Sequence, residues 1–502
     1  MLTAVPLLRG LAGNPALPAD LLDSMITSAD AELATELAES ARLSPAQAGQ
    51  LAETGGTDTR IRLVRRGLLG ADQLRRPEPS VVLALLDTAA LPPDRALELI
   101  RHPDPSIRAD LAAVPQLTAD LVVRLADDEE PDVVADVAMR EDLTPELAGT
   151  LARHPHAAVR AALARNERTP PHLLAALAAD GGRPALRHCH ACQGRPDRQY
   201  GRWCDGAHEG AVLTIQLATV TNPATPAAAL TGFPDHPDTF LRSMLATRPD
   251  LLPTAYQRLA RDPVLGVRCN LAANPVIGEL MMRRLASVDD NRHEVRRQLA
   301  ENPALPLDLL AGLAQSTRIG PTLLPRIANA NTDEVLALAE STVPAVRMLL
   351  AHRPELPEPV VRRLASDPDA KVLKAIAPNP AVSEEQLWAM VERHGNRVAA
   401  AVARNPNCGP DLLLGLVRRH PSSWRLHREV ARHPNAGPEA LRSCLAHERV
   451  RPLAARHPGL SVPVLLELLV DPEEDVVFAA AGNPALPRTA MEAALAGEPF
   501  EG

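Results

Sequence analysis

The stretch Asn302-Pro-Ala-Leu-Pro-Leu-Asp-Leu-Leu310 is the clearest copy of a pattern that recurs along this chain. Its first proline disfavours a helical residue before it, so the Asn-Pro pair ends one helix. Its second proline, Pro306, lies near the first turn of the next helix, where a missing N–H costs nothing. The two leucines that close the stretch, together with Leu313, place an apolar stripe on one helix face. The stretch therefore predicts a short helix bounded by proline and buried along one side.

The Asn-Pro pair, or a variant with Arg or His before the proline, returns at intervals that are mostly 24 to 28 residues. We call the residue before this proline the marker. The markers are Asn14, Asn222, Arg248, Asn274, Asn302, Arg353, Asn379, Asn405, His433, His457 and Asn483. A fixed period of this length is the signature of a repeat architecture, in which one body can extend over 502 residues.

A second short segment follows the first helix in each repeat. The clearest copies are Val159-Arg-Ala-Ala-Leu-Ala164 and Val267-Arg-Cys-Asn-Leu-Ala272, which are long enough for about two helical turns. Two helices this short cannot bury a face alone, so adjacent repeats must stack. The predicted fold is all-α: an α/3₁₀ or α–α solenoid of repeats of about 24–28 residues.

The Asn-Pro-Ala-Leu-Pro-x-x-Leu-Leu motif (14–22 and 302–310) and the Val-Arg-x-x-Leu-Ala segments resemble the leucine-rich repeat variant family. The resemblance covers nearly the whole chain outside residues 181–212. It implies a right-handed solenoid that alternates α- and 3₁₀-helices. This family also carries an iron–sulfur module at its N-terminus, so the resemblance makes an iron–sulfur cluster one option for this chain. HEAT-like solenoids are the nearest alternative, but their repeats of about 40 residues do not fit this frame.

The composition agrees with stacked helices and restricts the kinds of binding partner that we expect. Hydrophobic residues make up 46% of the chain and aromatic residues only 2%, so the core must consist of Leu, Ala and Val. The 49 prolines recur at fixed intervals and therefore punctuate helices. Because the formal charge is −9, the chain as a whole has no positive electrostatic field that would attract nucleic acid. No apolar run reaches membrane-spanning length, and a cytoplasmic location is expected.

One stretch does not follow the repeat. About thirty extra residues, assigned to 181–212, stand between the two helices of one repeat and separate the arrays 1–180 and 213–502. They contain Cys189-x2-Cys192 and, after eleven residues, Cys204-x3-His208. Clustered thiolates with an imidazole at this spacing predict a metal centre, and zinc in a closed tetrahedral site is favoured. The same ligands could hold a [2Fe–2S] or [4Fe–4S] cluster.

The end of this motif, Cys204-Asp-Gly-Ala-His208, resembles the CDGSH iron–sulfur proteins, in which such a Cys and His bind one iron of a [2Fe–2S] cluster. Those proteins open with C-x-C, whereas this chain has C-x2-C. His188 and His190 flank Cys189 and are alternative ligands or hydrogen-bond donors. Zinc and iron–sulfur therefore both stay open.

Two further sets of residues recur in the repeats. The remaining cysteines, Cys269, Cys408 and Cys444, fall at helix positions that predict small buried hydrophobes. Arginines at one equivalent position form a series along the chain: Arg108, Arg160, Arg268, Arg296 and Arg347. We expect each to pair with an acid of a neighbouring repeat, with an acidic partner or a phosphate backbone as the alternative. The series stops at Leu373 and Ala399.

No nucleotide-binding, metalloprotease or serine-hydrolase motif is present. The sequence therefore favours a non-enzymatic scaffold that binds a macromolecule on its concave surface, with a protein as the expected partner. An iron–sulfur redox or iron sensor is the second hypothesis, and a nucleic-acid-binding solenoid is the third, which the net charge disfavours.

Overall fold

The computed structural model describes residues 4–180, 209–287 and 293–500. Within these ranges the chain forms thirty-three α-helices and four 3₁₀-helices, and no strand. The helices group into two compact units. Unit one contains residues 1–74 and 320–502, and unit two contains residues 75–319. The all-α class expected from the sequence is confirmed.

Each repeat has two antiparallel helices that follow one marker. The first helix begins a few residues after the marker, as α27 (Pro410–Arg419) does after Asn405, and has proline in its first turn. The second helix, as in α28 (Trp424–Val430), ends just before the next marker, His433. Of the two expected alternatives, the described repeats favour paired α-helices. Single 3₁₀-helices replace the first helix in two repeats, at 93–98 and 227–230.

Unit one draws its helices from both ends of the chain. Its first helices are α2 (Ala19–Ser28), α4 (Pro45–Thr54), α21 (Thr332–Ala339), α23 (Glu358–Ala365), α25 (Glu384–His394), α27, α29 (Pro438–Leu445), α31 (Val462–Leu468) and α33 (Arg488–Ala496). Its second helices are α1 (Ala4–Ala12), α3 (Ala31–Ser40), α5 (Thr57–Arg65), α22 (Pro344–Leu350), α24 (Ala370–Ile376), α26 (Asn396–Val402), α28, α30 (Arg451–Ala455) and α32 (Glu474–Ala481). The short helices η1 (Ala71–Gln73) and α20 (Pro325–Ala328) complete it.

Unit two follows the same order. Its first helices are η2 (Pro93–Glu98), α8 (Ala119–Ala126), α10 (Pro145–Leu151), α12 (Pro171–Asp180), η3 (Ala227–Leu230), α15 (Pro253–Leu259), α17 (Glu279–Ser287) and α19 (Leu307–Ser316). Its second helices are α6 (Pro79–Asp87), α7 (Pro105–Ala113), α9 (Pro131–Ala138), α11 (Ala157–Arg165), α13 (Glu209–Thr221), α14 (Thr239–Leu245), α16 (Leu265–Ala273) and α18 (Glu294–Ala300). The turn η4 (Phe233–Asp235) precedes α14.

The core forms where second helices stack on one another. In unit two α7 packs on α9 and α9 on α11, and Val133, Val137 and Leu163 are completely buried there. Helix α13 begins at Glu209, before the expected boundary at 213, and packs on both α11 and α12. The stack of unit two therefore continues on the far side of residues 181–208. No helix in the described part is long and apolar enough to cross a membrane.

The marker side chain links each repeat to the one before it. Asn405 Nδ2 donates to the carbonyl oxygens of Ala377 (2.6 Å) and Asn379 (2.7 Å), at the end of the preceding second helix. Its Oδ1 accepts from the backbone N–H of Asn407 and fixes the following turn. Carbonyls at a helix C-terminus have no partner within the helix, so the buried marker amide satisfies them.

Other marker residues make the same link with different chemistry. Arg248 Nη1 donates to the carbonyl oxygens of Val220 (3.0 Å) and Asn222 (2.7 Å). His433 Nε2 lies 2.8 Å from the carbonyl oxygen of Asn405. Each of these side chains presents an N–H toward the preceding repeat, which explains why Arg and His can replace Asn before the proline.

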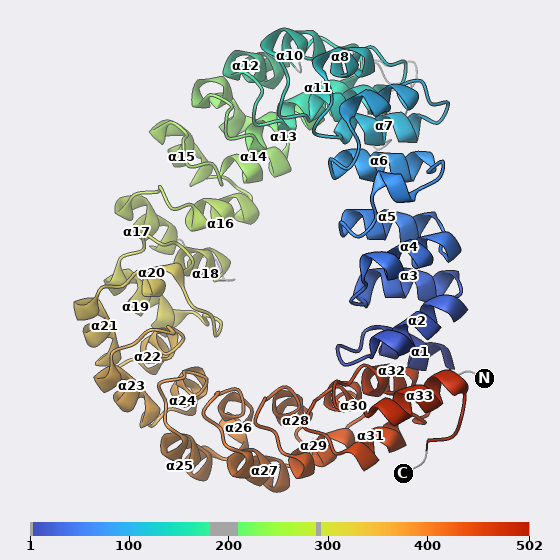
Figure 1. Cartoon of the computed structure of the whole chain (residues 1–502). Helices are drawn as coiled ribbons and strands as arrows, with labels where there is room; N and C mark the ends of the chain where they lie inside the picture. Colours follow the sequence, from blue (N-terminus) through green and yellow to red (C-terminus); the bar gives the residue numbers. More distant parts are fainter. Residues whose placement is uncertain (1–3, 181–208, 288–292, 501–502) are drawn as a thin grey trace. The chain divides into compact units, whose positions relative to one another are not determined.

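The two ends of the chain together build one repeat of unit one. The last marker, Asn483, is followed by the first helix α33, which is the last helix among the described residues. Helix α1 takes the place of its second helix: it packs on α32 as a second helix packs on its predecessor, and it also packs on α33 (Figure 1). Both chain ends therefore lie beside one another within this unit (Figure 1).

Candidate functional site

The predicted metal ligands lie outside the described residues. Cys189, Cys192, Cys204 and His208 all fall within 181–208, as do His188 and His190. Among the residues that the structure does describe, no group of three or more His, Cys, Asp or Glu side chains could hold a metal ion. The metal centre therefore stays a prediction from the sequence.

The other cysteines are structural where they are buried. Cys408 is completely buried, donates from Sγ to the carbonyl oxygen of Val402 (3.0 Å), and burial raises its pKa to about 12. Cys444 is equally buried, and burial raises its pKa to about 12 as well. Cys269 on α16 is half-buried. Thiols with pKa values this high stay protonated and unreactive at neutral pH, so the expected packing role of Cys408 and Cys444 is confirmed.

The arginine series is used inside the protein. Arg108 forms a bidentate ion pair with Asp128 of the next repeat (2.7 and 2.9 Å), and Nη1 donates to the carbonyl oxygen of His102. Arg347 pairs with Asp367 in the same way. In both cases the arginine and the aspartate stand twenty positions apart, one on each of two neighbouring repeats. The expected pairing between repeats is confirmed for these two.

Other members of the series donate to backbone carbonyls. Arg160, 1% exposed, donates from Nη1 to the carbonyl oxygen of His154, and Arg268 donates in the same way to that of Asp262. The sequence analysis did not identify Arg242, whose Nε donates a hydrogen bond to Oδ2 of Asp262 (2.6 Å). The signal was available, because Arg242 stands six residues before the marker Arg248, as Arg268 does before Asn274.

The ion pairs also set the protonation of their carboxylates. Burial acts to raise the pKa of Asp128, but the hydrogen bonds from Arg108 and from the backbone N–H of Glu130 outweigh it, and the net pKa is lowered. The hydrogen bonds that Arg108 donates to Asp128 raise the pKa of Arg108. Both groups are thus charged at neutral pH, and the pair fastens one repeat to the next rather than offering a free cation to a ligand.

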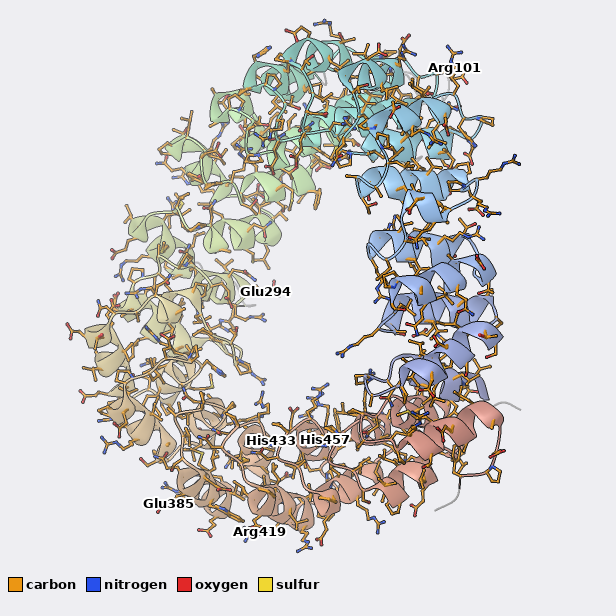
Figure 2. The ribbon with its side chains drawn as sticks, in the orientation of Figure 1. Arg101, Glu294, Glu385, Arg419, His433 and His457 are labelled. Carbon is orange, nitrogen blue, oxygen red and sulfur yellow. The ribbon has the colours of Figure 1, made fainter. Side chains whose placement is uncertain are left out.

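Unit one has two exposed edges with different chemistry. We call the side carrying the second helices and the markers after them the second-helix edge, and the opposite side the first-helix edge. Figure 2 shows His433 and His457 on the former and Glu385 and Arg419 on the latter. Glu385 lies in the first turn of α25, where an acid stabilises a helix N-terminus.

Basic residues gather on the second-helix edge between α24 and α30. Three consecutive repeats have arginine both eight residues before the marker and directly before it: Arg397 and Arg404, Arg425 and Arg432, Arg449 and Arg456. All six are exposed, and we call them the basic strip. Aligning the repeats on their markers would have revealed the strip from the sequence, but its exposure comes from the structure.

An apolar side chain breaks the pattern on the first-helix edge of unit two. Leu280, in the first turn of α17, is 85% exposed. It stands six residues after its marker, where seven other repeats have an acid: Asp20, Asp120, Glu146, Asp308, Glu385, Asp411 and Glu439. Val276 before α17 and Leu252 before α15 are each 47% exposed. Large apolar side chains gathered at an exposed edge are typical of a protein-binding surface.

Comparisons with known proteins add little beyond the fold class. No protein-family model and no curated protein matches the chain. A solved structure described as "a leucine-rich repeat variant with a novel repetitive protein structural motif" is similar, with 19% sequence identity and a TM-score of 0.22. The match covers 66% of this chain and 88% of the other. At this TM-score the two do not superpose as wholes, and the class, an all-α repeat protein, rests on the helices and contacts described above.

Proposed function

We propose that this chain is a non-enzymatic repeat scaffold whose function is to bind a protein partner. The observation that carries the proposal is the exposure of three apolar side chains at the N-terminal ends of α15 and α17: Leu252, Val276 and Leu280. Its position on the first-helix edge differs from the concave surface expected from the sequence. Burying Leu280 alone would contribute about 2 kcal/mol to binding.

The repeat pattern itself supports a binding role for Leu280. An acid at this position stabilises the helix N-terminus and keeps the surface soluble, as Asp308 does one repeat later. Helix α17 already has Glu279 in its first turn, so Leu280 is not required there for helix stability. An exposed leucine without a packing role fits contact with another protein.

The test compares two variants that each exchange an exposed apolar side chain for aspartate. Leu280→Asp introduces the kind of side chain found at this position in seven other repeats, and Val470→Asp, at a residue 66% exposed in unit one, is the matched control. A photo-reactive residue at 280 should cross-link a protein from an extract of the source cells. Leu280→Asp should abolish co-purification of that protein, whereas Val470→Asp should retain it. Equal retention by both variants would contradict the proposal.

We also infer, from the cysteine and histidine spacing alone, a metal centre held by Cys189, Cys192, Cys204 and His208. Zinc is favoured, and the centre would then be a structural staple for the inserted residues. The alternative, a [2Fe–2S] or [4Fe–4S] cluster, would make the chain a redox or iron sensor. We also propose, from the sequence, that the repeats form a right-handed solenoid and that the protein is cytoplasmic.

A further inference from the structure

The arginines of the basic strip are not used in ion pairs within the described part of the protein. None of its six arginines forms an ion pair with another described residue, and all six are exposed. The second helices α24, α26, α28 and α30, with the two turn residues at each of their ends, contain ten basic residues and two acids, Asp369 and Glu429. The whole chain carries a net charge of −9, so this local excess of positive charge arises from the repeat arrangement.

Repeat geometry sets the spacing of the strip. The two arginines of one repeat stand seven positions apart, one near each end of the second helix. Second helices of successive repeats pack at about 8–10 Å. Helix α24 extends the strip by one repeat, with exposed Lys371 eight residues before Asn379. The cations therefore follow a regular lattice along the second-helix edge.

The arginine series is interrupted after Arg347 and resumes at Arg451, in the last repeat of the strip, where Arg451 pairs with Asp471. Six residues before the marker, Arg347 is followed by Leu373, Ala399 and His427 in the next three repeats. In these repeats the cation is found two residues earlier instead, at Lys371, Arg397 and Arg425. The earlier position is exposed, whereas Leu373 and Ala399 are buried. The cation that forms an ion pair with the next repeat elsewhere in the chain is exposed to solvent in these three repeats.

An aromatic ring lies within the strip. Trp424, at the start of α28, is 38% exposed, and the guanidinium groups of Arg425 and Arg428 lie 5.6 and 5.5 Å from the centre of its ring. The equivalent positions in the two flanking repeats, Asn396 and Glu448, have no ring. A surface that combines a row of cations with an exposed aromatic side chain is typical of proteins that bind single-stranded nucleic acid.

We propose that the basic strip binds the phosphate backbone of a single-stranded nucleic acid, with a base stacked on Trp424. Evenly spaced cations match a polymer that has a phosphate on every nucleotide, whatever its sequence. An acidic protein segment is the competing partner, but it offers no reason for the exposed ring. This binding uses unit one and is independent of the protein surface proposed at Leu280.

The test measures binding of the full chain to a fluorescent oligothymidylate of about 16 nucleotides by anisotropy, across a salt series. The test variant Arg397→Gln/Arg425→Gln/Arg449→Gln removes one column of the strip. The control Arg393→Gln/Arg419→Gln/Arg442→Gln removes the same charge from exposed positions on first helices α25, α27 and α29. Circular dichroism and the melting temperature establish that both variants are folded.

We expect the test variant to bind at least about tenfold more weakly at moderate salt and to flatten the salt slope by about 2, since each contact with a single strand contributes about −0.7. The control should bind like the unmodified chain. Trp424→Ala should weaken binding by about tenfold without changing the slope, because stacking does not release counterions.

Three results would overturn the proposal. The first is no salt-dependent binding of the oligonucleotide, and the second is equal weakening by the test and control variants. The third is preferential binding of polyglutamate over the oligonucleotide, which would identify an acidic protein segment as the partner.

Discussion

The side-chain amide nitrogen of Asn14 lies 2.8 Å from the carbonyl oxygen of Ala481, a residue 467 positions away in the chain. It also donates to the carbonyl oxygen of Asn483 at 2.8 Å. Asn483 makes the same pair of bonds to Ala455 and His457 in the preceding repeat. The first marker of the chain is thus the structural successor of the last one, and the repeat between them is shared by α33 and α1.

Removing the Asn14 amide should loosen both chain ends. Asn14→Ala leaves two buried carbonyls without a donor and should cost about 1–3 kcal/mol. Hydrogen exchange should speed up in α1, α32 and α33 together, because these helices share one repeat. Asn405→Ala, the matched control, removes the same bonds inside the array and should leave the protection of α1 unchanged. Independent exchange of α1 and α32 in Asn14→Ala would argue against the shared repeat.

The same junction depends on a glycine. A Cβ added at Gly10 would lie 2.3 Å from the carbonyl oxygen of Phe478 and 2.7 Å from Cβ of Ala481, so α1 could not approach α32 as it does. Gly10→Ala should therefore destabilise unit one by about 1–3 kcal/mol. Gly312→Ala on α19, where a Cβ would meet nothing within 4 Å, should instead stabilise its helix by up to about 1 kcal/mol. Thermal melts of the two variants check the opposite signs.

The arginine–aspartate pairs fasten adjacent repeats. Arg347→Leu leaves Asp367, 5% exposed, without its ion pair and should cost about 3–5 kcal/mol in urea unfolding. The double variant Arg347→Leu/Asp367→Ala should lose less than the single variant, because no buried charge is then left unpaired. A larger loss in the double variant would mean that the pair does not act as a unit.

His427 should make unit one sensitive to acid. Burial, its largest influence, and the nearby His447 lower the pKa of His427 below its ordinary value near 6.5, although a hydrogen bond to Ser423 opposes them. The unfolded chain binds this proton more readily, so stability falls as the pH drops below about 6.5. His427→Leu, which introduces the residue found at the equivalent Leu373, should reduce the dependence of the melting temperature on pH between 7 and 5. Identical slopes for the two proteins would exclude His427 as a source of the dependence.

The predicted metal centre is tested by composition. Protein purified without oxygen should contain one zinc per chain, with no visible colour, if the site is a structural staple. Iron with acid-labile sulfide, lost in Cys204→Ser, would instead establish the iron–sulfur alternative. Protein with neither metal, and with the same content after Cys204→Ser, would refute the metal centre. Ser366→Cys, an added surface thiol on the described part of the chain, controls for adventitious binding.

Much of the fold follows from local features of the sequence. Proline fixes its own φ angle and restricts the residue before it. An Asn-Pro pair such as Asn302-Pro303 therefore marks a helix boundary in each repeat that contains one. Leucine spacing then identifies the buried face of each first helix. These effects act within a few residues, which is why the repeat period and the all-α class could be predicted without knowing any distant contact.

Tertiary structure decided what depends on neighbours far along the chain. Arg108 and Arg397 are both arginines at fixed places in a repeat, but one is buried against Asp128 and the other is exposed. The sequence marks Asn14 as the first repeat boundary, yet only the folded chain brings it to Ala481. Burial, ion pairing and the joining of chain ends depend on distances in space, and these are set when the helices of separate repeats pack together.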